Sequence, residues 1–319
     1  MAEASSGKQT RSWSKRQRVW VSRGPPLYRQ GPTDGARYGS VQYGYPIVSG
    51  CIFLAARGVT QTHHSPRSPG ASDWETTPLS PLSESDMVSD PRQNRLLARL
   101  APKDFNALRP HLEAMQLPLR HPLEKPGRRI ESVYFFESGI ASVVAIQSND
   151  TRVEVGLIGC EGMSGVAVVL GNHQTPNSTY MQVAGAGHRI SSDALRTAMA
   201  KNAGLQPILL KFVQAFMVQT TQTAICNARS LLDERLARWI LMAHDRCTGA
   251  TIALTHEFLA LMLGVRRAGV TETLHALVKR GLVKSGRGEI TVLDRAGLEA
   301  SAGDSYGVPE REYRRLLGR

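Results

Sequence analysis

Residues 254–282 place the strongest constraint on what this 319-residue chain can fold into. Thr255 can cap a first helix, because its hydroxyl can accept a hydrogen bond from an unpaired backbone N–H. Gly264 follows that helix and can adopt a positive φ at little cost, as a sharp turn requires. The small Ala260 lies four positions before the glycine, and the apolar Val270 lies six positions after it. This pattern predicts a helix-turn-helix.

A second helix is expected from about Arg266 to Lys279, with apolar side chains facing inward at Val270, Leu274, Leu277 and Val278. Its outer face is basic and polar. Such a face on its own is compatible with an ordinary, solvated two-helix hairpin. The residues that follow the helix, however, read as strand, glycine turn and strand, which is the pattern of a wing. Arginine can recognise guanine in the major groove, which admits a helix. We therefore predict a DNA-binding winged helix that contacts DNA through Arg266, Arg267, Thr271, Glu272, His275, Lys279, Lys284 and Arg287.

Charge, cysteine spacing and hydropathy limit the partners, cofactors and location that the chain can have. The formal net charge of +12 favours a polyanionic partner but does not establish one. The four cysteines lie far apart, so neither a zinc site nor a disulfide framework is indicated and no cofactor is identified. No apolar run reaches the roughly 18 residues that span a bilayer, and the start of the chain lacks the pattern of a secretion signal. We expect a cytoplasmic protein that does not contact membranes.

The chain divides into four segments by pattern. Residues 1–86 lack any helical or strand period, and we expect a disordered extension, because they offer too little apolar surface to offset the entropy of ordering. A basic arm that contacts DNA is the alternative for this segment. Residues 87–203 contain short β-branched and aromatic runs between turn residues, which predict an antiparallel β-roll (jelly-roll) with flanking helices. Residues 204–228 read as a long helix and 229–319 as the winged-helix domain, so the expected fold class is α+β.

The long helix carries side chains that recur at alternating steps of four and three, as in a coiled-coil seam. A two-fold dimer would bury this seam against a second copy, and a dimer suits a palindromic DNA site. The alternative is that the seam packs on the β-roll of its own chain. The predicted seam of the dimerisation helix consists of Leu209, Val213, Phe216, Thr220 and Thr223.

A glycine-rich loop, GCEGMSG at 159–165, lies between the last two predicted strands and precedes VAVVLG. With this loop, the hairpin YFFESGIASVV and the motif ALMLGVRRAGVTETLHALVKRGLV, the chain resembles the Crp/Fnr family of bacterial transcription regulators over roughly residues 90–294. The resemblance implies a homodimer that binds DNA, works with RNA polymerase and senses an unidentified signal through a cyclic-nucleotide-binding-like roll. The effector pocket that it implies comprises Gly162, Met163, Ser164, Gly165, Asn177 and Ser178.

The sequence departs from the family at several of these positions. Cyclic-nucleotide-binding members have a glutamate where this chain has Met163 and an arginine where it has Asn177. A buried phosphate without a cation would bind poorly, so we expect no tight binding of cyclic AMP. On the recognition helix, Arg267 matches the family's first base-reading arginine. Ala268 and Glu272 replace its glutamate and second arginine, so the operator should differ from that of the cyclic AMP receptor protein.

A cupin-like metal-dependent enzyme built on the β-roll is the alternative from another functional class. Such an enzyme needs histidines and a carboxylate clustered on neighbouring strands. The predicted roll has no H-x-H motif, and its carboxylates are scattered. We therefore expect a regulator with no catalytic residues and no metal site. His173 and His188 leave haem binding open, although a solitary histidine is more often an ordinary structural residue.

Overall fold

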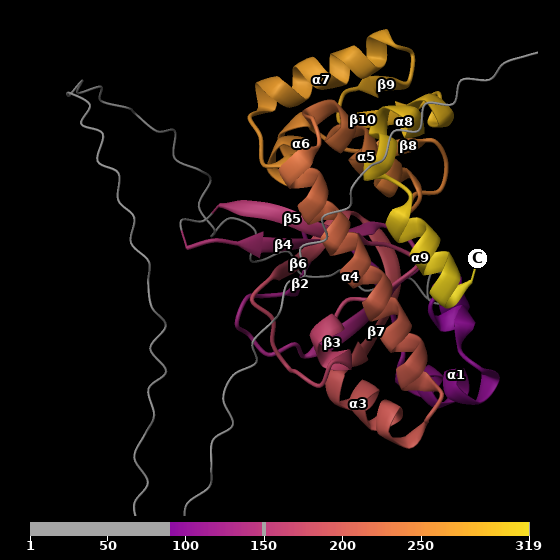
Figure 1. Ribbon diagram of the computed structural model, residues 1–319. Coiled ribbons are helices and arrows are strands. Elements are labelled where there is room, and N and C mark those ends of the chain that lie inside the picture. The colour runs from indigo at the N-terminus through magenta and orange to yellow at the C-terminus, as the bar shows by residue number, and fades with distance from the viewer. Residues whose placement is uncertain (1–89, 149–150, 319) are drawn as a thin grey trace, which may run out of the picture. The chain divides into compact units, whose positions relative to one another are not determined.

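The computed structural model describes residues 90–148 and 151–318 (Figure 1). The extension predicted for residues 1–86 lies outside the described residues. The described part follows the predicted order of β-roll, long helix and winged helix, and its sheets are antiparallel. Among its helices, none combines the length and the apolar character needed to cross a bilayer. The predicted α+β fold class is confirmed.

Two antiparallel sheets form the roll, one in the order β1-β7-β3 and the other in the order β2-β6-β4-β5. Apolar side chains from both sheets fill the space between them, with Phe135, Met181 and Ile190 fully buried. The strands are β1 (Glu113–Leu117), β2 (Pro122–Glu124), β3 (Ser132–Phe136), β4 (Ile140–Ile146), β5 (Arg152–Ile158), β6 (Ser178–Val183) and β7 (Gly185–Ser191).

Short helices precede the roll and cover one end of it. The first is capped by Asp90, whose carboxylate accepts a hydrogen bond from the backbone N–H of Arg92 at 3.0 Å. Helix does not continue beyond His111, since Pro110 has no N–H to donate and residues 113–117 pair with β7 as β1. These helices are η2 (Pro91–Gln93), η3 (Leu97–Arg99), α1 (Pro102–Leu108) and η4 (Arg109–His111).

Three helices complete the roll: α2 (Val166–Val169), α3 (Ser192–Lys201) and the long α4 (Leu205–Arg229). Helix α4 packs along β5, where the Gln219 side chain binds both main-chain groups of Leu157. The Leu157 N–H donates to Gln219 Oε1 at 2.6 Å, and Gln219 Nε2 donates to the Leu157 carbonyl at 3.1 Å. The Phe216 ring lies so close to Gly156 that a Cβ there would be 2.7 Å from it. The roll and α4 therefore form one packed unit.

The seam predicted for dimerisation faces the roll of its own chain instead. Leu209, Val213 and Phe216 are buried in the core that α4 shares with the roll, and Thr220 and Thr223 are half-buried. The seam assignment is therefore wrong for its three apolar members, because the roll already covers them. The periodicity was real, but it marks the inner face of α4.

The winged-helix domain follows directly. Its three-stranded sheet has the order β8-β10-β9, and the first of these strands is too short to have been predicted from the sequence. The last helix returns along α4, toward the short helices at the start of the described chain (Figure 1). The elements are α5 (Leu232–His244), β8 (Thr251–Ala253), α6 (His256–Leu263), α7 (Arg267–Lys279), β9 (Val283–Gly286), β10 (Glu289–Val292), α8 (Arg295–Ala302), η5 (Gly303–Ser305) and α9 (Val308–Leu317).

A buried polar contact joins the winged-helix domain to the roll. The Trp239 Nε1–H of α5 donates to Glu154 on β5 at 2.7 Å, and the Ser142 hydroxyl of β4 donates to the other carboxylate oxygen at 2.7 Å. Burial raises the pKa of the Glu154 carboxyl to about 7, although these two hydrogen bonds act in the opposite direction. The folded protein thus favours the neutral carboxyl.

We expect Glu154→Gln to remove a pH-dependent loss of stability. The unfolded carboxyl ionises at lower pH than the folded one, so the contribution of the neutral group is complete below the unfolded pKa and is lost as pH rises toward 7. The free energy of unfolding of the unmodified protein, measured in urea, should fall by about 1–3 kcal/mol relative to E154Q between about pH 5 and about pH 8. Glu272→Gln, on the exposed face of α7, is the control, and parallel profiles for E154Q and the unmodified protein would contradict the prediction.

Candidate nucleic-acid interface and glycine loop

The helix-turn-helix has the predicted geometry. The Thr255 hydroxyl caps α6 by accepting a hydrogen bond from the Phe258 N–H at 3.2 Å. Gly264 ends the helix with φ at 63°, in the left-handed region that favours glycine. Ala260 and Val270 are buried where α6 and α7 pack together. The local sequence signals therefore place the two helices as expected.

The inner face of α7 consists of Val270, Leu274 and Leu277, which are fully buried. Val278 was also predicted to face inward, but its side chain is 37% exposed. It lies at the edge of the apolar stripe, where no neighbouring element covers it. The buried stripe holds α7 with its opposite, basic face turned outward.

That outward face contains seven of the eight predicted DNA-contacting residues in exposed positions. Helix α7 lies along the free side of the winged-helix domain, away from the roll (Figure 1). Five of these seven residues are arginine or lysine and one is a carboxylate, so together they give this face a positive charge suited to phosphate. The exposed residues are Arg266, Arg267, Glu272, His275, Lys279, Lys284 and Arg287.

The eighth residue, Thr271, is half-buried and is held by protein groups. Its hydroxyl lies 3.0 Å from His256 Nδ1, and it donates to the Arg267 carbonyl at 3.1 Å. The other ring nitrogen of His256 lies 3.5 Å from the Ser285 hydroxyl of the wing. Sequence reasoning missed His256, which connects the recognition helix to the wing, because its partners are distant along the chain.

Arg267 forms an ion pair with Glu257 at 3.2 Å, and both side chains are exposed. An exposed ion pair of this kind contributes about 0–1 kcal/mol. The guanidinium can therefore exchange this partner for a base edge at small cost.

The glycine loop that was predicted to hold an effector is part of the roll's core. Gly162, Met163, Ser164 and Gly165 are all buried. The Ser164 N–H donates to the Tyr134 carbonyl at 2.9 Å, and the Tyr134 N–H donates to the Ser164 hydroxyl at 3.0 Å. These bonds fix the loop to β3. Asn177 and Ser178, the other two predicted pocket residues, are half-buried at the start of β6.

The loop is packed against other parts of the protein at Gly162 and hydrogen-bonded at Gly165. A Cβ on Gly162 would lie 2.3 Å from the Phe212 ring, so this ring fills the space against the loop. The Gly165 N–H, at the start of α2, donates to the buried Glu124 carboxylate at 2.6 Å. A helix start otherwise favours a bound anion. The loop thus has neither free space nor a free donor at these two points.

Within 90–148 and 151–318, no group of three or more His, Cys, Asp or Glu side chains is placed to hold a metal ion. His173 and His188 do not come together, because His173 is exposed in the loop before β6, whereas His188 is buried beside Glu137 at 3.0 Å. The cupin-like alternative gains no support from these residues.

Comparisons with known proteins agree with this geometry. A model of the Crp-like helix-turn-helix domain matches residues 234–301. Among solved structures, one from Eubacterium rectale, assigned as a transcriptional regulator of the Crp/Fnr family, aligns at 17% identity and a TM-score of 0.53, covering 66% of this chain and 99% of that one. FixK2 from Bradyrhizobium japonicum aligns at 16% identity and a TM-score of 0.51, covering 60% and 98%. The comparison with curated proteins found no match.

A third similar structure is the c-di-GMP-responsive global regulator CLP from Xanthomonas campestris. It aligns at 17% identity and a TM-score of 0.50, covering 60% of this chain and 99% of that one. At these identities the structures show a shared fold. The described part of the chain thus has the fold of these regulators, with a Crp-like helix-turn-helix domain at 234–301.

We expect Gly162→Ala to destabilise the protein by about 1–3 kcal/mol, because the added methyl group would overlap the Phe212 ring. The double variant Gly162→Ala/Phe212→Leu should recover part of this loss, since the smaller side chain leaves room. Urea unfolding measures both changes. Gly269→Ala is the matched control, because its added Cβ would lie at an ordinary 3.4 Å from Leu232. Unchanged stability of G162A would show that the loop is not tightly packed.

Proposed function

We propose, from the Crp-like helix-turn-helix domain and the Crp/Fnr fold of this chain, that it is a sequence-specific transcription regulator that binds a palindromic operator as a homodimer. The observation that carries the proposal is the basic face of α7, which is exposed together with the basic side chains of the wing. No catalytic step is needed for this function, because affinity depends on the separation of two recognition helices. RNA polymerase is the proposed protein partner, and the cytoplasm the proposed site of action.

The exposed side chains suggest a division of roles in DNA binding. Arg266 and Arg267 stand at the N-terminal end of α7, the end that reads base edges in helix-turn-helix proteins. Lys279 lies at the other end of α7, and Lys284 and Arg287 lie in the wing. These three cations suit contacts with the sugar-phosphate backbone, which position a protein without reading sequence.

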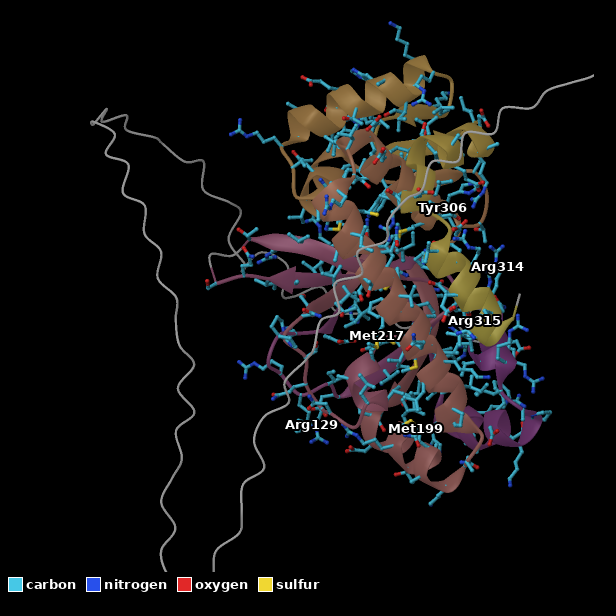
Figure 2. The ribbon with its side chains drawn as sticks, in the orientation of Figure 1. Arg129, Met199, Met217, Tyr306, Arg314 and Arg315 are labelled. Carbon is cyan, nitrogen blue, oxygen red and sulfur yellow. The ribbon has the colours of Figure 1, made fainter. Side chains whose placement is uncertain are left out.

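An exposed apolar stripe on α4 supports dimerisation. Leu210, Met217 and Ile225 are 39%, 55% and 50% exposed, and they are spaced by seven and eight residues. This spacing returns to one face of a helix, as in a coiled coil. Figure 2 marks Met217 on α4. We propose that this stripe packs against the same stripe of a second copy. Leu210 and Met217 each lie one position after a member of the seam predicted from the sequence.

DNA selection with the purified protein should enrich a palindrome. Arg267→Ala should then lose about 1–3 kcal/mol of discrimination at one base pair of each half-site, because a bidentate guanine contact is removed. Lys279→Ala should weaken binding to all sequences and lower the salt dependence by about one phosphate contact. Fluorescence anisotropy against salt concentration measures both.

Arg109→Ala, an exposed arginine before the roll, is the matched control for charge. Equal losses in R109A and R267A would indicate that only general charge matters. Failure to enrich any sequence would reject sequence-specific binding altogether.

Met217→Glu should convert the dimer to a monomer, because four carboxylate oxygens would be brought together in an apolar seam. Analytical ultracentrifugation measures the mass, and thermal unfolding at high dilution shows that the monomer still folds. Leu119→Glu is the control, since Leu119 is exposed to a similar degree, 58%, but lies off α4. A fully dimeric M217E would show that another surface forms the dimer.

A further inference from the structure

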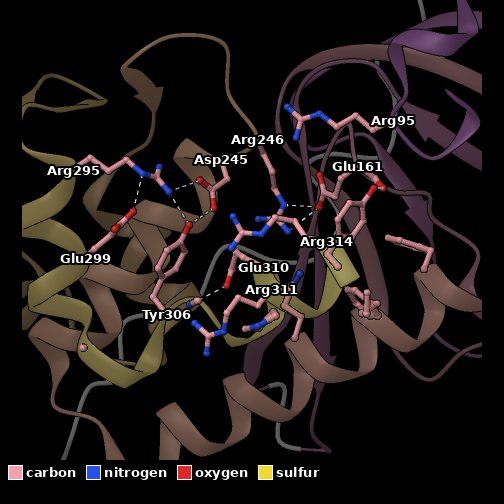
Figure 3. Close-up of a pocket in the computed structure, with 18 residues that line it drawn as sticks. Arg95, Glu161, Asp245, Arg246, Arg295, Glu299, Tyr306, Glu310, Arg311 and Arg314 are labelled. Carbon is pink, nitrogen blue, oxygen red and sulfur yellow. Dashed lines mark hydrogen bonds and ion pairs between the residues drawn. The ribbon is translucent and has the colours of Figure 1, made fainter. Parts of the chain in front are cut away.

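A cleft of about 550 Å³ lies between α9 and the roll (Figure 3). Helix α4 forms its floor with Phe212 and Phe216, while Glu161 of the glycine loop lines its side. We propose that this cleft binds a compact polyanion, a small molecule with two phosphate or carboxylate groups. The volume is within the range of small-molecule sites.

The acidic side chains at the roll side of the cleft are already neutralised. Glu161 pairs with Arg246 at 2.8 Å, and these side chains are only 13% and 8% exposed. The main-chain carbonyl of Glu161 accepts a hydrogen bond from the Tyr313 hydroxyl of α9 at 2.8 Å. This wall therefore carries no unpaired carboxylate.

The acidic side chains of the opposite wall are also engaged. Arg295 binds Asp245 at 2.8 Å and Glu299 at 2.9 Å, and the Tyr306 hydroxyl donates to Asp245 at 2.6 Å. The fourth carboxylate, Glu310, accepts a hydrogen bond from the backbone N–H of Gly307 at 2.9 Å and so caps α9. All four carboxylates of the lining thus have a partner within the protein (Figure 3).

Three arginines of the same lining have no such partner. Arg95, Arg311 and Arg314 are exposed, and among the described residues none of them forms an ion pair or a side-chain hydrogen bond. The lining holds five arginines and four carboxylates, so its net excess is only one positive charge, but all the unpaired charges are positive. A guanidinium offers a planar fork of donors that matches phosphate and carboxylate. The groups of the cleft that lack a partner are therefore guanidinium groups, which would bind an anion.

The three arginines come from two different parts of the chain, so an anion bound to all of them would link these parts. Arg95 precedes the roll, whereas Arg311 and Arg314 belong to α9 at the end of the winged-helix domain. Leu317 of α9 is buried in the core of the roll, so the helix is already docked there. An anion held by Arg95 and Arg314 would strengthen this docking. Binding of the anion does not depend on the proposed function. An effect of the anion on DNA affinity does rest on the proposed function.

Isothermal titration of the full-length protein, at about 50 mM salt and without DNA, tests the site. One arm uses inorganic pyrophosphate and the other uses citrate, which separates phosphate from carboxylate recognition. At least one should bind once per chain, and Arg311→Ala/Arg314→Ala should weaken that binding about tenfold or more. Arg315→Ala is the matched control, because Arg315 lies on the same helix but pairs with Glu312 at 2.7 Å and does not line the cleft (Figure 2).

The proposal is overturned if neither anion binds at about 1 mM, if R311A/R314A binds as the unmodified protein does, or if R315A loses as much affinity as the double variant. Circular dichroism confirms that each variant is folded. DNA binding is measured separately by anisotropy. A protein that binds pyrophosphate but no DNA would keep the site and reject the proposed function, whereas the reverse result would reject only the site.

Discussion

The direction in which the recognition helix points depends on the packing of α5 and α6 against the outer face of β4 and β5. Ile140, Val144 and Leu157 of the roll belong to the same buried cluster as the core of the winged-helix domain. Each fully buried aliphatic side chain contributes about 1.5–3 kcal/mol to stability. The hydrogen bond between Trp239 and Glu154 fixes the orientation of the two domains more specifically, because it requires a defined geometry. With this interface in place, the opposite side of the domain, which carries α7, faces solvent. The exposure of the basic face of α7 thus depends on the burial of the apolar side chains between the roll and the other side of the domain.

Helix α4 has two apolar faces. Its inner face closes the roll, and its outer face leaves an apolar stripe that the described chain does not cover. In the proposed dimer, such a helix would link the roll to the second copy, because both surfaces belong to one helix. The same helix forms the floor of the cleft beneath α9. A ligand there would contact the roll, α4 and the winged-helix domain together.

The glycine loop is part of the packed core of the roll. Its buried side is filled by Phe212 and by hydrogen bonds to Tyr134 and Glu124, while Glu161 points to the other side and lines the cleft. Met163 is buried among apolar neighbours, which explains why a residue without charge stands there. The loop therefore acts as a structural support between the core of the roll and the arginine-lined cleft.

The sequence by itself determined the elements whose signals are local. Thr255 caps α6, Gly264 ends it with a positive φ, and the apolar period of α7 selects its outward face, so the helix-turn-helix could be predicted residue by residue. Tertiary structure alone decided which of two neighbouring stripes of α4 the roll would bury, because both repeat at helical spacing. It also decided that the glycine loop is filled, that β1 and β8 are strands, and that α9 docks on the roll. These outcomes depend on partners far along the chain, and no local pattern specifies such partners.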